Sequence, residues 1–221
     1  MRISDLSRQA GVPVGTIKFY LREQLLPPGE PTGRNQALYN KNHLRRLRLI
    51  KIFTSLGEFD LTSVRRLLIA AEDEHLPPIE LFEVLNQVAM AGKDTAAEED
   101  ESLELARADA DRIIESAGWQ VPADAAARSH LTLTLAAMRR LGCDCDPDFL
   151  DVYRDAADRL ARHEVSRIAT DQTARIEALA RNVLLHQAFA AMRQLGQQHH
   201  LSRRFGLVPA HPGAADDGDH S

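Results

Sequence analysis

Four hydrogen-bond donors stand at every second position of a short segment near the start of the chain. They are Thr16, Lys18, Tyr20 and Arg22. Hydroxyl, ammonium and guanidinium groups are donors that proteins direct toward phosphate oxygens and base edges. On a helix, these residues fall mainly on the faces away from its apolar side. The segment therefore indicates contact with a nucleic acid, provided that neighbouring elements hold it outward.

The charge of the chain is divided between two regions of opposite sign. Residues 1–71 hold 12 Lys and Arg against 5 Asp and Glu, a net charge of +7. Residues 72–221 hold 15 against 27, a net charge of −12, so the overall value of −5 hides the division. A positive field on a short segment raises the local concentration of a polyanion and speeds its encounter. The first region is therefore the candidate for nucleic-acid binding.

Two short helices joined by a glycine are expected to position the donors. Ser4 is predicted to cap a first helix over Asp5–Ala10. Gly11 is expected to end that helix, because a residue without a Cβ tolerates the sharp turn. The second helix, over 16–22, carries Ile17 on its apolar side for packing on the first. This pattern is the helix-turn-helix arrangement that enters the major groove of DNA.

The next segment is broken by proline and glycine and predicts a two-stranded wing. Residues 27–36 are PPGEPTGRNQ, a sequence that cannot be helical. The flanking residues are short and compatible with β-structure. We expect Gly33, Arg34 and Asn35 near the tip, where Arg34 is placed for a phosphate or the minor groove. An ordinary surface loop is the alternative interpretation.

Two longer helices complete the basic region. Asn40 or Asn42 is suited to cap a helix whose apolar side faces inward over 44–56 and whose outer side is crowded with arginines. Asp60 is suited to cap a further helix over 61–71.

Residues 2–71 as a whole resemble the MerR-type winged helix-turn-helix regulators. The resemblance covers about a third of the chain. It implies four helices with a small wing, and binding within promoters accompanied by distortion of the duplex. In order along the chain, it is carried by Ile3-Ser4-Asp5-Leu6-Ser7, Ala10-Gly11-Val12, Thr16 to Tyr20, Leu25 to Pro28, Gly33-Arg34, Tyr39, Leu44 to Leu47, Leu56-Gly57, and Leu61 with Val64 to Leu68.

The resemblance also implies which residues meet DNA. Lys18 stands where the family often has Arg, and an ammonium group lacks the planar fork that forms two hydrogen bonds with guanine. The implied DNA-binding set is Ser4, Val14, Thr16, Lys18, Phe19, Tyr20, Arg22, Gly33, Arg34, Asn35, Gln36 and Tyr39.

The remaining two thirds depart from the long coiled-coil helix with which many such regulators dimerise. Pro77 and Pro78 cannot continue a helix, so we expect residues 72–78 to be a linker and a helical domain to occupy 79–205. Residues 206–221, rich in Gly, Ala, Asp and Pro, predict a disordered tail. The helices of the domain are predicted at about 79–91, 102–117, 124–141, 147–168 and 172–200. With 44% apolar and 5% aromatic residues, the expected fold class is dominated by α-helix.

Two groups of residues are candidates for ligand binding. Cys143 and Cys145 lie one residue apart between carboxylates and are metal candidates, although zinc requires four ligands and no nearby His or Cys completes the set. Two thiols at a helix corner are the alternative. Trp119, His130 and His186 are candidates to line an effector pocket, against ordinary roles in a core or at its rim. No cofactor is expected.

Catalysis and membrane insertion find no support in the sequence. It has no phosphate-binding glycine loop, nucleophile elbow or His-Glu-x-x-His pair, so we do not expect an enzyme. It also has no apolar run of transmembrane length and no signal-peptide pattern, so we expect a cytoplasmic protein without a membrane partner.

The expected function is that of a sequence-specific DNA-binding transcription regulator that acts as a homodimer on promoter or operator DNA. Its C-terminal helical domain is expected to sense an effector or to dimerise, with a small-molecule effector and RNA polymerase as further candidate partners. Two alternatives stay open. One is a DNA-tethered adaptor whose acidic bundle docks another protein, and the other is an architectural DNA binder without sequence preference.

Overall fold

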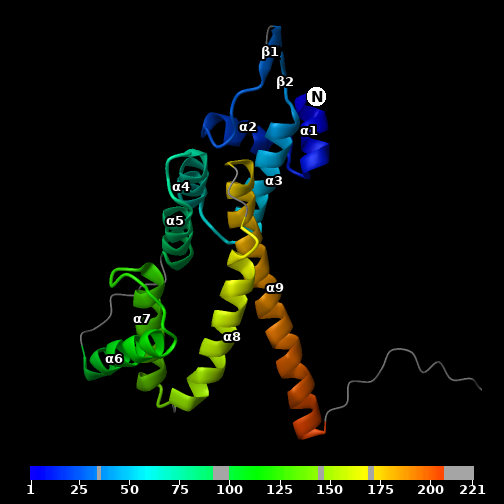
Figure 1. The fold of residues 1–221 in the computed structure, drawn as a ribbon. Helices are drawn as coiled ribbons and strands as arrows, with labels where there is room; N and C mark the ends of the chain where they lie inside the picture. The colour runs from blue at the N-terminus through cyan, green and yellow to red at the C-terminus, as the bar shows by residue number, and fades with distance from the viewer. Residues whose placement is uncertain (34–35, 92–99, 144–146, 169–171, 207–221) are drawn as a thin grey trace, which may run out of the picture. The chain divides into compact units, whose positions relative to one another are not determined.

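The computed structural model describes residues 1–33, 36–91, 100–143, 147–168 and 172–206. Within them the chain forms nine helices and one two-stranded antiparallel sheet (Figure 1). The helices are α1 (Ile3–Ala10), α2 (Val14–Arg22), α3 (Lys41–Ser55), α4 (Leu61–Glu72), α5 (Pro78–Met90), α6 (Glu101–Ser116), α7 (Ala126–Arg140), α8 (Pro147–Val165) and α9 (Gln172–Phe205). The strands are β1 (Glu30–Gly33) and β2 (Gln36–Leu38). This architecture confirms the predicted fold class and the wing.

The chain divides into two compact units, Met1–Val183 and Leu184–Ser221. The described part of the second unit is the later portion of α9 with Gly206. The tail predicted over 206–221 lies outside the described residues, apart from Gly206 itself.

The first helix begins earlier than the sequence suggested. It starts at Ile3, so Ser4 lies inside the first turn and the prediction that Ser4 caps the helix was wrong. A non-local pairing contributes, because the Met1 amino group donates to the Tyr39 carbonyl at 2.7 Å and the Tyr39 N–H donates back to the Met1 carbonyl at 2.8 Å. This pairing fixes the chain just before Ile3. Asp5 then accepts from the backbone N–H of Arg2 at 3.3 Å.

Helix α2 begins at Val14, two residues before the predicted start, whereas local capping signals predicted the starts of α3 and α4 correctly. The Asn40 side chain accepts from the backbone N–H groups of Asn42 and His43, at 3.0 and 3.2 Å, so Asn40 rather than Asn42 caps α3. The Asp60 carboxylate accepts from the Ser63 N–H at 2.7 Å and caps α4. This hydrogen bond from the Ser63 backbone also lowers the pKa of Asp60.

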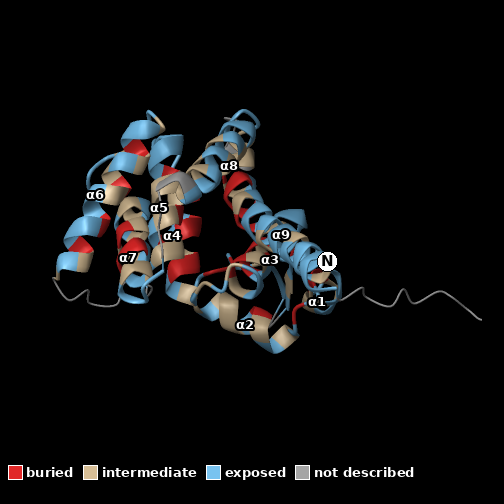
Figure 2. Ribbon diagram, turned by 90° about the horizontal axis from the view of Figure 1, so that it is seen from below, coloured by how far each residue is buried: buried red, intermediate tan, exposed pale blue. Residues whose placement is uncertain are grey.

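One hydrophobic core joins the predicted DNA-binding region to the helices beyond it. Buried residues of α3 and α4 pack with buried residues of α5 and of the first turns of α9, and Figure 2 shows buried residues along α4 and α5. The predicted linker at 72–78 is therefore a turn between helices that share a core. The buried residues of this core are Leu25, Leu49, Ile50, Phe53, Val64, Leu67, Leu68, Ala71, Leu81, Leu85, Val88, Leu179, Ala180 and Val183.

A separate small core holds α6 and α7 together. Leu103, Ala106 and Ala110 of α6 pack against Leu135 and Ala136 of α7. The small alanine side chains allow the two helices to approach closely. The pair is a helical hairpin with its own buried seam.

The start of α9 is a structural part of the first unit, and this can be tested by shortening one side chain. Leu179 is fully buried in the core shared with α3, α4 and α5. Leu179→Ala should lower the free energy of unfolding by about 2–5 kcal/mol, because it removes buried methyl groups and leaves a cavity. Urea denaturation measures the loss. Leu201→Ala, at a side chain that is 55% exposed on the same helix, is the control and should stay within about 0.5 kcal/mol of the parent. Equal stabilities for both variants would contradict the packing of α9 on this core.

Candidate nucleic-acid interface

Helix α2 is held in place by apolar contacts on one side and by a tight turn before it. Ile17 is fully buried and packs with Leu6 and Ala10 of α1. Gly11 ends α1 with a φ of +62°, a value that favours glycine. The Ser7 hydroxyl donates to the Val12 carbonyl at 2.6 Å and fixes the turn. These contacts set the orientation of α2 relative to α1.

The opposite side of α2 presents the basic residues. Lys18 and Arg22 are exposed, and Thr16 and Val14 of the same helix are half-buried. The Arg22 guanidinium lies over the Phe19 ring, 5.3 Å from its centroid, an arrangement that gives the long side chain a preferred direction. The structure therefore brings Thr16, Lys18 and Arg22 onto one helix, as the sequence predicted.

Two of the residues predicted to contact DNA, Tyr39 and Tyr20, pack mainly against other residues of the domain. Tyr39 is only 8% exposed, and its ring meets the edge of His43 with centroids 5.2 Å apart. Burial also raises the pKa of the Tyr39 phenol. Tyr20 is half-buried and packs against both hydrophobic clusters of the N-terminal region. These two aromatic rings therefore pack mainly beneath the candidate DNA-binding surface and contribute little exposed area to it.

The wing projects from the same domain with β1 exposed, while Ala37 of β2 packs against the hydrophobic cluster of α1 and α2. Its strands pair Glu30 with Leu38 and Gly33 with Gln36, and every residue of β1 is exposed. At its base, a Cβ on Gly29 would lie 2.7 Å from the Leu38 carbonyl oxygen, so the crossing of the two chain segments requires glycine. The predicted tip residues Arg34 and Asn35 lie outside the described residues.

Most of the basic residues on α3 and α4 form ion pairs or hydrogen bonds with other residues of the protein. The sequence did not reveal these partners. Arg46 forms an ion pair with Glu72 of α4, and Arg45 forms one with Glu177 of α9 at 2.8 Å. Arg65 donates to the Glu23 carbonyl at the end of α2, at 2.6 Å. The partners lie tens of residues away in the sequence, so no local spacing could have indicated them. Arg46 and Arg45 instead belong to a pocket that is described below.

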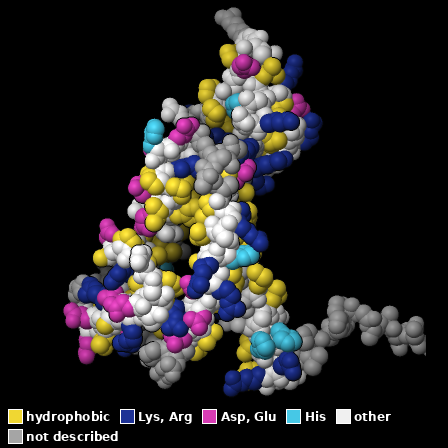
Figure 3. Space-filling model, viewed as in Figure 1, with side chains coloured by type: hydrophobic (Ala, Val, Ile, Leu, Met, Phe, Trp, Pro, Cys, Tyr) yellow, Lys and Arg dark blue, Asp and Glu magenta, His cyan; other side chains and the backbone are white. Residues whose placement is uncertain are grey.

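Basic side chains are grouped near α1 and α3 and also occur along the later helices, whereas acidic residues are frequent over α6 and α7 (Figure 3). Ser4, Gly33 and Gln36, the remaining members of the predicted DNA-binding set, are exposed on α1 and on the wing. Within the part of the chain that the structure describes, the N-terminal domain thus presents exposed basic side chains on α2 and a hairpin whose first strand is exposed.

The other ligand candidates lie on different elements of the chain. The Trp119 indole N–H donates to Asp158 at 3.1 Å. The pKa of Asp158 is lowered mainly by its hydrogen bond with Arg162 and to a smaller extent by this indole. His130 is half-buried on α7, and His186 is exposed on α9. None of these three lines the 390 Å³ pocket that is described below.

The metal hypothesis for the two cysteines gains no support from the described residues. Cys143 is exposed, and Cys145 lies outside the described residues. Within the described ranges, no three His, Cys, Asp or Glu side chains come together as a metal site would require.

A buried two-helix corner, basic donors on its second helix and a hairpin with an exposed first strand define a winged helix-turn-helix protein. The family described as "MerR HTH family regulatory protein" matches residues 1–70. Residues 1–70 are therefore a MerR-family helix-turn-helix domain, as the resemblance predicted.

Curated relatives match a segment of similar length. The HTH-type transcriptional regulator ZntR of Escherichia coli strain K12 is 36% identical over 75 residues, which are 34% of this chain and 52% of that protein. The ZntR homolog of Haemophilus influenzae is 35% identical over 68 residues, which are 31% of this chain and 50% of that protein. The chain thus spans about half the length of the curated relatives it matches.

A solved structure resembles nearly the whole chain. The crystal structure of SCO5550 from Streptomyces coelicolor A3(2) matches with a TM-score of 0.69 and 29% sequence identity, over 94% of this chain and 99% of that one. The likeness therefore extends well beyond the N-terminal domain into the helices that follow it.

Within the described residues, no helix combines the length and the apolar character that crossing a bilayer demands.

Proposed function

We propose that the protein is a sequence-specific DNA-binding transcription regulator that acts as a homodimer. The observation that carries the proposal is the outward face of α2, where Lys18 and Arg22 are exposed on a helix anchored by the buried Ile17. A helix presented in this way fits the major groove of B-DNA. The curated relatives named above are transcriptional regulators, and they match about a third of this chain.

The contacts within this proposal differ in kind. Lys18 and Arg22 reach base edges and phosphates of the DNA from α2. The exposed residues of the wing lie along the sugar-phosphate backbone next to that groove. Arg45 and Arg46 are paired with carboxylates, so they add little to the positive field that DNA meets. The DNA sequence is then recognised mainly by α2, and the wing fixes the position of the domain on the duplex.

The proposed dimer uses the later part of α9. Along this segment Leu185, Met192 and Leu195 are exposed by 39%, 60% and 65%, and Ala188 is exposed as well. Positions 185, 188, 192 and 195 are spaced by three and four residues, the seam of a helix that pairs with another helix. A second copy of the chain is the occupant that we propose. One helix-turn-helix module has few phosphate contacts, and two half-sites raise the affinity.

A salt titration of DNA binding tests the proposal. The protein should bind the DNA upstream of its own gene more tightly than a scrambled duplex at physiological salt, with a footprint of two half-sites. The logarithm of the affinity should fall linearly with the logarithm of salt concentration, by about 0.9 for each phosphate neutralised. Fluorescence anisotropy on both duplexes gives both quantities.

The scrambled duplex is the control for sequence preference. Equal, steeply salt-dependent affinity for both duplexes would instead support an architectural binder. No binding to either duplex at low salt would contradict the DNA-binding function.

A further inference from the structure

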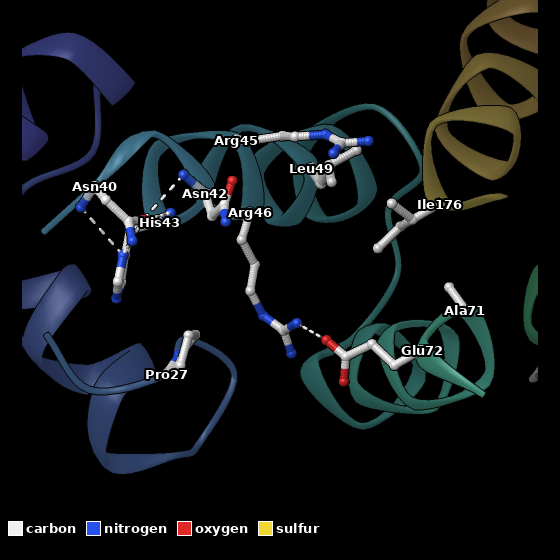
Figure 4. Close-up of a pocket in the computed structure, with 10 residues that line it drawn as sticks. All are labelled: Pro27, Asn40, Asn42, His43, Arg45, Arg46, Leu49, Ala71, Glu72 and Ile176. Atoms are coloured by element: carbon white, nitrogen blue, oxygen red, sulfur yellow. Dashed lines mark hydrogen bonds and ion pairs between the residues drawn. The ribbon is translucent and has the colours of Figure 1, made fainter. Parts of the chain in front are cut away.

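A pocket of about 390 Å³ lies between the N-terminal domain and the first turns of α9. All of its walls belong to the unit Met1–Val183. Figure 4 shows Arg46 extending from α3 into the space between Pro27 and Glu72, with Leu49, Ala71 and Ile176 along the other side. The pocket therefore has a charged wall at Arg46 and an apolar wall, and the polar side chains of Asn40, Asn42, His43 and Arg45 complete its lining.

The charged wall is a partly desolvated guanidinium. The Arg46 side chain is 20% exposed, and burial lowers its pKa from the ordinary value. Its Nε donates to the Leu25 carbonyl at 2.6 Å, and its Nη1 pairs with Glu72. The Leu25 carbonyl oxygen holds the guanidinium in one orientation. A planar guanidinium held in this way matches the two oxygens of a carboxylate.

Glu72 is a carboxylate that another carboxylate can replace. Its side chain is 55% exposed at the last residue of α4, so it returns to water at little cost when it leaves Arg46. The exchange keeps the buried positive charge compensated, which a neutral ligand would not do. The geometry thus favours an anionic group at Arg46.

The apolar wall selects the rest of the ligand. Leu49 and Ala71 are buried, and Ile176 is half-buried at the edge of the main core. A DNA phosphate gains nothing from such a wall, and the carboxylates of Glu72 and Glu177 beside the arginines repel a polyanion. A small molecule with an apolar body and one carboxylate satisfies both walls.

We propose that this pocket binds a small organic carboxylate with an apolar body, held through its oxygens by Arg46. The site connects elements of the DNA-binding domain with α9. Arg45 of α3 pairs with Glu177, and Arg175, 8% exposed, donates to the carbonyls of Asp73 and Leu76 at 3.1 and 2.6 Å. A ligand that displaces Glu72 loosens the end of α4 from α3. The consequence for DNA affinity, but not ligand binding itself, rests on the regulator function proposed above.

Isothermal titration calorimetry of the full chain with 3-phenylpropanoate tests the pocket. The matched probe is 3-phenylpropanamide, which has the same apolar body and no charge. The carboxylate should bind at least about tenfold more tightly than the amide, as expected for a charge-assisted hydrogen bond. Equal binding of the two probes, or no heat with either at millimolar concentration, would overturn the proposal.

Three variants locate the binding. Arg46→Gln should weaken 3-phenylpropanoate binding by about tenfold or more, and Glu72→Gln should strengthen it by about threefold, since it removes a partly exposed competitor. Arg48→Gln, an exposed arginine of the same helix outside the pocket, should change nothing. Because Glu72→Gln keeps the shape of the side chain, it decides the question even when Arg46→Gln does not fold. Unchanged affinity in Glu72→Gln would place the probe elsewhere.

A DNA titration with and without 3-phenylpropanoate tests the coupling. The probe should lower the affinity for the promoter duplex by about fivefold, within the usual range of coupling between two sites. Probe binding without any DNA binding would remove the regulator function and leave the pocket. Loss of DNA affinity in Arg46→Gln, together with no probe heat in the parent, would assign Arg46 to the DNA backbone instead.

Discussion

Replacing Met192 and Leu195 together with glutamate should convert the protein from a dimer to a monomer. Both side chains are large, apolar and more than half exposed on α9. Each is worth about 1.5–3 kcal/mol when fully buried, and a glutamate at the same position places a charge in the seam. The pair of substitutions therefore removes the main favourable contact and adds repulsion between the two copies. Size-exclusion chromatography with light scattering measures the mass directly.

The same variant should lose most of its affinity for a duplex with two half-sites. Two linked modules bind DNA about a hundredfold to ten-thousandfold more tightly than one module does. The affinity of the monomer for this duplex should therefore be lower by a factor in this range. Affinity for a duplex with a single half-site should change little, because each module is intact. Fluorescence anisotropy on the two duplexes separates these effects.

The control introduces the same charges on the opposite side of the helix. With 3.6 residues per turn, Gln194 and Gln197 fall away from the seam formed by Met192 and Leu195. Gln194→Glu with Gln197→Glu should leave the dimer and the DNA affinity unchanged. A dimer that survives the seam substitutions, or dissociates equally in the control, would place the interface elsewhere.

Local signals in the sequence were sufficient for the elements of the DNA-binding domain. The side chains of Asn40 and Asp60 cap helices through N–H groups two and three residues away, so both caps could be predicted from neighbouring residues. The proline and glycine pattern likewise predicted the wing, since those residues exclude a helix. Such short-range chemistry is visible without knowledge of the fold.

Contacts between distant residues were beyond the sequence. The start of α1 depends on hydrogen bonds between Met1 and Tyr39, 38 residues apart, and Arg46 meets Glu72 at a separation of 26. Arg175 meets the Asp73 carbonyl at a separation of 102. Periodicity predicts which face of a helix is apolar, but it does not name the partner across the core. For this reason the arginines of α3 were expected on the solvent side, and the pocket was missed.

Removing the two basic side chains of α2 should weaken DNA binding about a hundredfold. Lys18 and Arg22 are exposed on the helix that is proposed to enter the major groove. A base or phosphate interaction of this kind is worth about 1–3 kcal/mol, and Lys18→Ala with Arg22→Ala removes two of them. Fluorescence anisotropy on the promoter duplex gives the affinity. The salt dependence should also become shallower, by about 0.9 in logarithmic slope for each phosphate that the variant no longer neutralises.

The slope and the sequence preference separate the roles of the two residues. A residue that contacts only phosphate strengthens binding to all duplexes equally. A residue that contacts a base edge also increases the gap in affinity between the promoter duplex and the scrambled duplex. Arg22 has the planar fork for a base and is aligned by Phe19, so Arg22→Ala should narrow this gap more than Lys18→Ala.

A control with the same change of charge is available in α8 and just beyond it. Arg159→Ala with Arg167→Ala removes two exposed arginines outside the N-terminal domain and should leave the affinity near that of the parent. A decrease as large as that of the α2 variant would mean that the overall field, and not the face of α2, controls binding. Parent-like affinity of the α2 variant would mean that α2 does not enter the groove.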